Sequence, residues 1–545
     1  MLNFIHIFGL TLFTLLFKYF FLKDLYFYID DFAVFSDFER TNSIFPMYTD
    51  RPLFGIFLLP IFQILKWNSI LYHLLGAILE VSANLTVYYI CMKIIWRNKF
   101  YSSLTVLFFL LIPGHSQQYW WNTLLPLKVL LIMWLGSIYT FYKFILSDKF
   151  KYLIWSSFLY GITLFWYELA LFLPVIHLLI YAKLVIIPKR KIITIKAVKV
   201  FSCFIAYIFF FVLFRATKSF GFSASFDRSQ FLPFDQIFAR VKNILKLTFW
   251  LFPQMENNVG SHAFKSSPFT DLSIVLLGLI FAFLIVTYFS HIFKLLGSTS
   301  HSFTTNDYTF TLVFAIGMCL YPLIPFFFSP AWFDTRHTYL SHLGLAILIV
   351  LMIKLVLDNA QKLPKNYVKY LVSVTVLFSM SLVLVQYAES ILGNGVIYRE
   401  VGLDLKNYEA IVKKQFPTVQ PHTLFLFKDT EKLRNGYVPV FAGDWVVNGF
   451  ISKIYPLQDT QGHYYSLLDE NHPEKSLLKI NSDLNSLSLN QDKYLFSQII
   501  ILDAKNKFRS YSEIKIKNSE GDHIKRLQTS SDNDSINSVL EISIP

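Results

Sequence analysis

Long apolar runs recur along roughly the first 390 residues, and they constrain the fold more than any other feature of the sequence. The first run, about Phe4 to Leu22, contains one charged residue, Lys18. A helix of about 20 apolar residues is long enough to cross the hydrocarbon core of a bilayer. Comparable runs follow at about 69–96, 102–113, 124–146, 152–187, 198–214, 272–293, 308–328, 340–357 and 367–387. The pattern predicts an α-helical polytopic membrane protein with about 11 transmembrane helices.

Basic clusters between these runs predict how the chain is oriented. The net charge of +13 is compatible with nucleic-acid binding, but Lys and Arg fall in short clusters at the ends of apolar runs. This is the positive-inside pattern of membrane proteins. The run 152–187 lies between two such clusters, so we expect a hairpin with its turn near Trp166–Glu168. The N-terminus is then cytoplasmic, and an odd number of spans places the C-terminus outside the cytoplasmic (inner) membrane.

Cysteine usage and the N-terminal run exclude some simpler readings. The three cysteines, Cys91, Cys203 and Cys319, all fall within apolar runs, so we expect each to be a small buried residue. Their spacing fits neither a disulfide framework nor a zinc finger. The first apolar run is longer than the core of a signal peptide and lacks a small-residue cleavage site, so we expect a retained helix.

Composition changes beyond Glu389, where the apolar runs shrink to strand length. Thr423–Phe427 and Ser497–Leu502 are examples, and polar and turn residues increase around them. The sequence therefore predicts a transmembrane domain at 1–388 and a soluble, extracytoplasmic α/β domain at 389–545, which is a normal size for a domain. Its Ser-, Asn- and Asp-rich final stretch is expected either to be loose or to add an edge strand.

The outer loop at about 23–68 carries the strongest candidate site. Asp30 and Asp31 follow the first apolar run directly, at the height of the membrane surface, where ionisable side chains usually serve function. Wherever the backbone is extended, the two carboxylates point different ways, so one of them is expected to contact a substrate. Arg51-Pro52 follows, and the short apolar run 53–65 fits a helix lying in the membrane interface.

This order of elements resembles the GT-C superfamily of polyprenyl-phosphate-sugar-dependent glycosyltransferases, in particular its GtrII-like and protein-mannosyltransferase-like members. The likeness continues through Tyr72-His73-Leu74 into the next span. The segment 166–174 resembles that group's Lys-Glu-x(n)-Pro hairpin, with Tyr167 in place of the Lys. The segment 334–344 resembles its Glu-Arg-Tyr-x-Tyr-Leu-Pro-Ser-x-Gly motif, with Ser341 and His342 in place of Pro-Ser. The resemblance covers about Met1 to Tyr387.

The resemblance implies an inverting hexosyltransferase that takes a sugar from a polyprenyl-phosphate donor. The acceptor would be a protein, a glycolipid or a cell-envelope glycan such as the O-antigen of lipopolysaccharide. Such a reaction needs a base for the acceptor hydroxyl, which a carboxylate supplies, and a clamp for the leaving phosphate, which Arg supplies. The residues implied are Asp30 or Asp31 as base, Arg336 as phosphate clamp, Glu168 and Arg51 as supports, and His337, Tyr339 and Arg215 as weaker candidates.

Several of these residues have simpler explanations that stay open. Arg336 and Arg215 are also explained as snorkelling residues at helix ends, and Arg51 as a headgroup anchor. Glu168 is also explained as a hairpin-turn residue paired with a Lys. His115, Gln117 and Gln118 are candidates for hydrogen bonds to sugar hydroxyls, whereas His262 reads as an ordinary loop residue.

The sequence requires no cofactor, and it leaves alternative functions open. Asp30, Asp31 and Glu168 are oxygen ligands of the kind that Mg²⁺ or Mn²⁺ would take. Walker, GxGxxG and HExxH motifs are absent, which fits a donor carried on lipid rather than on a nucleotide. One alternative is a transporter or flippase for lipid-linked glycans, which would need charges at mid-membrane depth and usually a two-fold repeat. Neither is evident in the sequence. The other is a non-catalytic membrane protein whose outer domain binds a partner.

Overall fold

The structure is a computed structural model of the 545-residue chain. It describes residues 2–19, 25–44, 51–115, 117–186, 194–219, 232–249, 272–296, 303–328, 335–428, 434–435, 438–440, 444–455, 460–464, 478–480, 486–489, 492–503, 509–518, 521–527 and 540–543. All structural statements below concern these residues.

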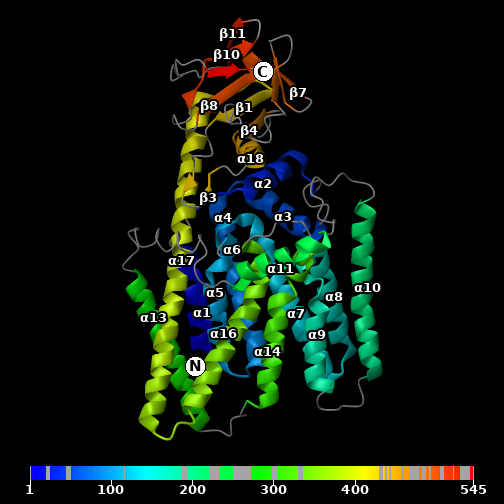
Figure 1. The fold of residues 1–545 in the computed structure, drawn as a ribbon, viewed down its shortest axis with the longest axis vertical. Helices are drawn as coiled ribbons and strands as arrows, with labels where there is room; N and C mark the ends of the chain where they lie inside the picture. The colour runs from blue at the N-terminus through cyan, green and yellow to red at the C-terminus, as the bar shows by residue number, and fades with distance from the viewer. Residues whose placement is uncertain are drawn as a thin grey trace.

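Each predicted span corresponds to a helix of one bundle (Figure 1). The helices are α1 (Leu2–Tyr19), α4 (Ser69–Ile90), α5 (Lys99–Leu111), α7 (Leu125–Ser147), α8 (Phe150–Trp166), α9 (Leu173–Tyr181), α10 (Thr194–Ser219), α13 (Leu272–Leu296), α14 (Thr305–Leu320), α16 (Tyr339–Ala360) and α17 (Asn366–Gln415). Among the described residues, five helical segments are long and apolar enough to cross a membrane, and five further apolar helices are shorter. The predicted polytopic helical fold is confirmed.

Two details of the bundle follow directly from the sequence. The predicted hairpin is confirmed, because α8 ends at Trp166 and a 3₁₀ turn, η4 (Glu168–Ala170), leads into α9. The span predicted at 308–328 is interrupted instead. Its helix α14 ends at Leu320, just before Pro322, because proline removes a backbone donor and clashes with the preceding turn. The short helix α15 (Ile324–Phe327) follows.

The cysteine prediction is right for two residues and wrong for the third. Cys91 and Cys319 are buried between helices, but Cys203 is exposed. Cys203 lies on α10, which stands at the edge of the bundle and exposes large apolar side chains such as Phe209. The apolar character of this run therefore fits a helix side that faces lipid rather than the interior of the bundle.

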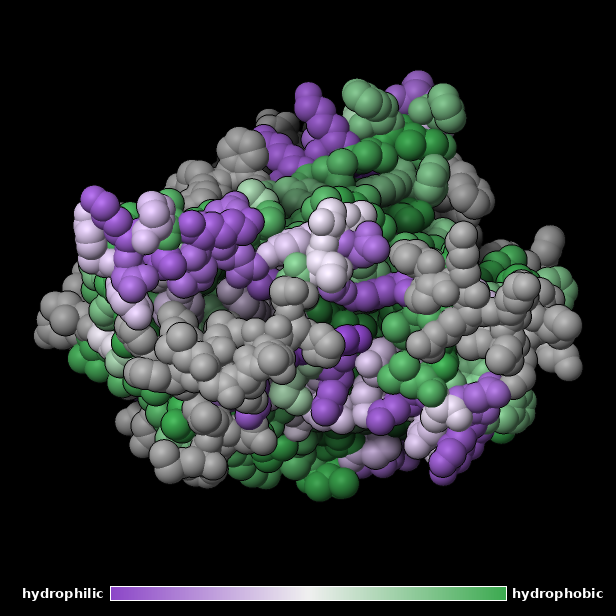
Figure 2. Space-filling view, turned by 90° about the horizontal axis from the view of Figure 1, so that it is seen from below, coloured by the Kyte–Doolittle hydropathy of each residue, from purple (hydrophilic) through white to green (hydrophobic). Residues whose placement is uncertain are grey.

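The two ends of the bundle differ in character. The upper end in Figure 1 lies beneath the C-terminal domain, and the N-terminal helix α1 begins towards the lower end. Viewed from below, hydrophilic side chains gather among the helix ends (Figure 2). Exposed basic residues at the lower helix ends include Lys93, Arg97, Lys149, Lys151, Lys362 and Lys365. This grouping is the one a positive-inside orientation requires, and which compartment each end faces stays a prediction.

The C-terminal region is an α/β unit, as predicted, with its strands in several small sheets. The main sheet has the order β4 (Thr460–Tyr464), β1 (Thr423–Lys428), β8 (Ile499–Asp503) and β9 (Arg509–Ser510), in which the first three are parallel. Helix α18 (Asp444–Ile454) precedes β4 and packs on it. A second sheet contains β10 (Glu513–Asn518), β11 (Gly521–Arg526) and β12 (Leu540–Ser543). Since β12 lies at its edge, the alternative of a terminal edge strand is confirmed.

Shorter elements complete the fold. Strands β5 (Leu478–Ile480), β6 (Ser486–Leu489) and β7 (Asp492–Leu495) form an antiparallel sheet, and β2 (Arg434–Asn435) pairs with β3 (Val438–Pro439). Helix α17 runs without a break through the predicted domain boundary at 388/389 and reaches the C-terminal sheets (Figure 1). The division of the chain at that residue therefore stays a prediction.

A layer of short helices covers the upper end of the bundle, beneath the C-terminal domain. It contains α2 (Asp30–Thr41) and α3 (Pro52–Leu65), with α18 lying directly above α2 (Figure 1). The segment between α5 and α7 adds η2 (Pro113–His115), α6 (Gln117–Trp120) and η3 (Asn122–Leu124). Helix α11 (Phe234–Phe249) packs against α15, and η7 (Thr335–Thr338) opens α16.

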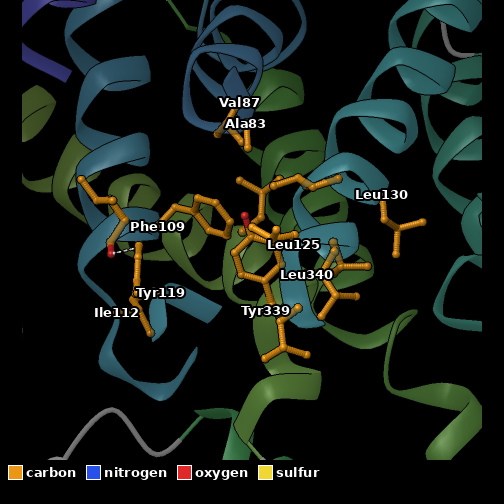
Figure 3. Packing of buried hydrophobic residues seen from close by; sticks show 14 of the residues in the cluster. Ala83, Val87, Phe109, Ile112, Tyr119, Leu125, Leu130, Tyr339 and Leu340 are labelled. Carbon is orange, nitrogen blue, oxygen red and sulfur yellow. Dashed lines mark hydrogen bonds between the residues drawn. The ribbon is translucent and has the colours of Figure 1, made fainter. Parts of the chain in front are cut away.

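Below this layer the interior is tightly packed and apolar. Figure 3 shows Tyr339 of α16 among Leu125 of α7, Leu340 of α16 and Phe109 of α5. The rings of Tyr339 and Phe109 lie 5.2 Å apart, within the range of favourable aromatic contacts. The hydroxyl of Tyr119 donates a hydrogen bond to the Leu110 carbonyl oxygen at 2.7 Å. This packing holds together the helices that support the upper layer.

Candidate functional site

The two adjacent aspartates are the first residues of α2. The backbone at Asp30 and Asp31 is therefore helical, so the condition of an extended backbone does not hold here. A helix N-terminus favours carboxylates because its unpaired N–H groups carry partial positive charge. Successive residues on a helix point about 100° apart. The two side chains consequently still face different surroundings, as expected.

The residue before the pair has an unusual backbone. Ile29 has φ 38° and ψ −104°. Positive φ is easy only for glycine, which has no Cβ, and Ile29 is branched at that atom. A β-branched residue in this region costs roughly 1–3 kcal/mol and persists only where its neighbours hold it. The Asp31 N–H closes the turn by donating to the Tyr28 carbonyl oxygen at 2.8 Å. Such strained turns cluster at functional sites, which supports this position as one.

Asp31 ties α2 to the segment between α5 and α7. Its side chain is fully buried and accepts hydrogen bonds from several N–H groups. Oδ1 accepts from the Thr123 backbone at 2.7 Å, and Oδ2 accepts from the Tyr28 backbone at 3.1 Å and from the Asn122 side chain at 3.1 Å. Burial raises the pKa of Asp31 to about 7, and these hydrogen bonds oppose the rise. Asp31 therefore acts as a clamp on the turn.

Substituting Asp31 by Asn should lower the stability of the protein and not only its activity. An amide leaves one oxygen as acceptor and turns an N–H₂ group towards N–H donors, so at least one buried donor loses its partner. We expect Asp31→Asn to lower the free energy of unfolding by about 1–3 kcal/mol. Thermal unfolding of the purified protein in detergent measures this loss, and an unchanged melting temperature would contradict the clamp.

The wild-type protein and Asp31→Asn should also differ in how their stability depends on pH. The pKa of Asp31 rises from 3.8 to about 7 on folding, so between these values the native state holds a proton that the unfolded state has lost. Stability therefore falls as pH rises from about 4 to 7. Asp31→Asn should lack this contribution, and melting curves of both proteins across that range test it.

Asp30 differs from its neighbour in exposure. Its side chain is half-buried rather than fully enclosed, and it occupies the first position of the helix. A helix N-terminus is a favourable place for a carboxylate, and a carboxylate can serve as a general base. Of the two aspartates, Asp30 is therefore the one that a substrate can reach.

Aromatic residues join this turn to the segment between α5 and α7 and to α17. The Tyr28 ring meets the Tyr398 ring edge-on, with centroids 5.1 Å apart. The Trp121 indole N–H donates to the Tyr398 hydroxyl at 2.9 Å, and the Trp120 ring stacks near it. Residues separated by more than 270 positions thus form one buried wall beside the aspartates.

Arg51 and Glu168 form a two-pronged ion pair. Arg51 Nε donates to Glu168 Oε2 at 3.0 Å, and its terminal nitrogen donates to Oε1 at 2.5 Å. Both side chains are mostly buried, at 13% and 15% exposed, and the guanidinium also lies 3.9 Å from the centroid of the Tyr167 ring. This geometry is the strong form of an Arg–carboxylate contact. The structure thus pairs two of the predicted support residues, with Arg rather than Lys as the partner of Glu168.

The segment around η7 packs on η2, in the segment between α5 and α7. The Thr338 hydroxyl donates to the Gly114 carbonyl oxygen at 3.4 Å, and a Cβ at Gly114 would lie 2.7 Å from His342 Cε1. His337 is buried with its ring 4.8 Å from that of Phe326, and Tyr339 points into the core. The close approach at Gly114 fixes the position of η7.

Other predicted site residues are only partly described. The backbone of Arg336 belongs to η7 and that of Arg215 to α10, but both side chains lie outside the described residues. The same holds for the side chains of His115 and Gln118, and all of His262 lies outside them. Gln117 is buried. The roles of these residues stay predictions.

The carboxylates suggested as metal ligands do not fit a shared cation site. Within the described part of the chain, no three His, Cys, Asp or Glu side chains are grouped closely enough to hold a metal ion. The Asp31 oxygens already accept N–H groups, and those of Glu168 face the Arg51 guanidinium.

One buried ion pair within the bundle was not predicted from the sequence, where charges at mid-membrane depth were not evident. Glu80 lies in the middle of the long apolar segment Ser69–Ile95, and Lys128 lies on α7. Their charged groups are 3.5 Å apart and almost completely buried, at 1% and 0% exposed. Single charges within otherwise apolar runs were the signal that could have identified them, because such residues usually face the bundle interior.

Comparisons with known proteins give one kind of match. No family model matches the chain, and no curated protein matches it. Two solved structures of ArnT from Cupriavidus metallidurans are similar to it, one bound to undecaprenyl phosphate and one in the apo state. Their TM-scores are 0.40 and 0.42, with 10% and 9% sequence identity, and each alignment covers 83% of this chain and 88% of the other.

Proposed function

We propose that this protein is a membrane-embedded glycosyltransferase that moves a hexose from a polyprenyl-phosphate donor to an acceptor on the extracytoplasmic face. The acceptor is a surface glycan, a glycolipid or a protein. The observation that carries the proposal is Asp30, a half-buried carboxylate on a strained helix N-terminus above a membrane bundle. The order of α1, the Asp-Asp turn, Arg51-Pro52 and α3 also matches the order that the sequence resemblance describes.

Each polar residue has a distinct part in this proposal. Asp30 is the general base, and Asp31 holds the turn that carries it. Arg336 binds the leaving phosphate, since a guanidinium pairs two phosphate oxygens at once. The Arg51–Glu168 pair fixes the start of α3 and the hairpin turn at one place.

The chemistry is a single displacement. The acceptor hydroxyl gives its proton to the Asp30 carboxylate as its oxygen attacks the anomeric carbon of the sugar. The bond from that carbon to the phosphate oxygen breaks, and polyprenyl phosphate leaves with the electron pair. One displacement inverts the anomeric configuration, and one carboxylate suffices as base.

Deletion of the gene tests the proposal. Mass spectrometry of surface glycans, glycolipids and envelope proteins should show a species that loses one hexose in the deletion strain and regains it when the wild-type gene is supplied. Unchanged masses in all three classes would overturn the glycosyltransferase assignment.

The buried Glu80–Lys128 pair favours a second candidate, a flippase for lipid-linked glycans. Paired charges inside a membrane bundle often line substrate paths. A flippase predicts a different result from the deletion: the lipid-linked sugar accumulates in the inner leaflet, while transfer in detergent-opened membranes persists. A glycosyltransferase predicts loss of transfer in both intact and opened membranes.

A further inference from the structure

The C-terminal domain contacts the candidate catalytic turn through one helix. Helix α18 packs directly on α2, the helix that begins with Asp30 (Figure 1). A Cβ added to Gly449 of α18 would lie 2.4 Å from the carbonyl carbon and oxygen of Phe32. Real Cβ atoms do not approach backbone that closely. Only glycine therefore permits this contact, two residues beyond Asp30.

Ring packing extends the contact at the residue after Gly449. The Phe450 ring meets the Phe32 ring with centroids 5.7 Å apart. Phe32 is completely buried, as is Phe450, so this interface excludes water. The aromatic pair and the glycine contact together fix both the distance and the rotation of α18 on α2.

A charged cluster anchors the far end of α18 to the outer loop. Lys453 forms an ion pair with Glu409 of α17, which also accepts a hydrogen bond from the Tyr26 hydroxyl. The Lys453 ammonium lies 5.1 Å from the centroid of the Tyr26 ring and 5.8 Å from that of Trp67. Lys453 is thus enclosed by residues from the segments that flank α2.

Resting on the function proposed above, we propose that the C-terminal domain forms part of the active site, with Gly449 and Lys453 as positioning residues for Asp30. The strained turn at Ile29 needs support from its surroundings. The Asp31 hydrogen bonds hold α2 from the bundle side, and α18 holds it from the opposite side. The domain consequently sets the position of the base without touching the reacting atoms.

Gly449→Ala isolates this contact, and Gly278→Ala is its matched control. Both glycines are helical, and alanine favours helix by about 1 kcal/mol in each case. An added Cβ at Gly278 meets nothing within 4 Å, whereas at Gly449 it collides with the α2 backbone. A loss confined to Gly449→Ala therefore reports the displacement of α2.

Two readouts separate positioning from simple destabilisation. Hexose addition to the surface glycan should fall at least about tenfold in Gly449→Ala, since a shift of about 1 Å at a catalytic group can cost 10²-fold. Its amount in the membrane should stay close to that of Gly278→Ala, so that lower transfer is not explained by less protein. In an Asp30→Cys background, the rate of labelling by a membrane-impermeant maleimide should change in Gly449→Ala and stay constant in Gly278→Ala.

Lys453 provides an independent variant if Gly449→Ala does not fold. Lys453→Met should lower hexose addition, and Lys453→Arg should restore it, because Arg retains both the charge beside Glu409 and the contact with the rings. Wild-type labelling and transfer in Gly449→Ala or Lys453→Met would overturn the positioning role. Full transfer by Asp30→Asn would overturn the proposed base instead, and the labelling experiment would still decide whether α18 positions the turn.

Discussion

Asp30→Asn is expected to lower hexose transfer by about 10²–10⁴-fold while the protein stays folded, because a positioned general base contributes that much to rate. Asparagine has nearly the same shape as aspartate but cannot accept a proton from the acceptor hydroxyl. The half-buried position of Asp30 at a helix N-terminus tolerates Asn well. Mass spectrometry of the surface glycan in a deletion strain carrying the variant gives the fraction modified, and a time course gives the rate.

Asp148→Asn is the matched control for this experiment. Asp148 ends α7 at the lower end of the bundle with φ 56°, a conformation that Asn adopts readily. It should transfer hexose at the wild-type rate. If Asp30→Asn also transfers at that rate, while Asp31→Asn folds and does not transfer, the base is assigned to the wrong aspartate.

The parts of this fold that depend on local chemistry could be predicted from sequence. Apolar run length and flanking basic clusters predicted the hairpin whose turn lies between Trp166 and Leu173, because a chain with both ends on one side must turn in between. Strands β1 and β8 were also predicted, because short apolar runs bounded by turn residues are typical of strands. The length of α14 was missed because hydropathy does not register Pro322.

The parts that depend on distant partners could not be predicted. Nothing near Asp31 reveals that Thr123, 92 residues away, donates to it, so burial of one aspartate and access to the other were indistinguishable. The contact between Gly449 and the Phe32 backbone likewise joins residues that are far apart in the sequence. Helix formation at Asp30 was missed because the preceding Ile29 gives no capping signal. The adjacency of the two aspartates thus pointed to the candidate site, and tertiary contacts distinguished the two residues within it.

Breaking the Glu80–Lys128 pair is expected to have the largest effect on stability. The two side chains are almost completely buried, so Lys128→Met leaves the Glu80 carboxylate without its cation. Removing one partner of a buried pair usually costs about 3–5 kcal/mol, because the remaining charge stays in a medium of low dielectric. The melting temperature of the purified variant in detergent should fall sharply, and the amount in the membrane should fall with it.

The double variant decides what the pair is for. Replacing both charges, as in Glu80→Gln with Lys128→Met, removes the uncompensated charge, so most of the lost stability should return. If it returns and hexose transfer also returns, the pair serves only to join α4 and α7. If stability returns and transfer does not, the pair acts in the reaction or in movement of the lipid-linked sugar. A Lys128→Met protein as stable as the wild type would show instead that the two charges do not stabilise one another.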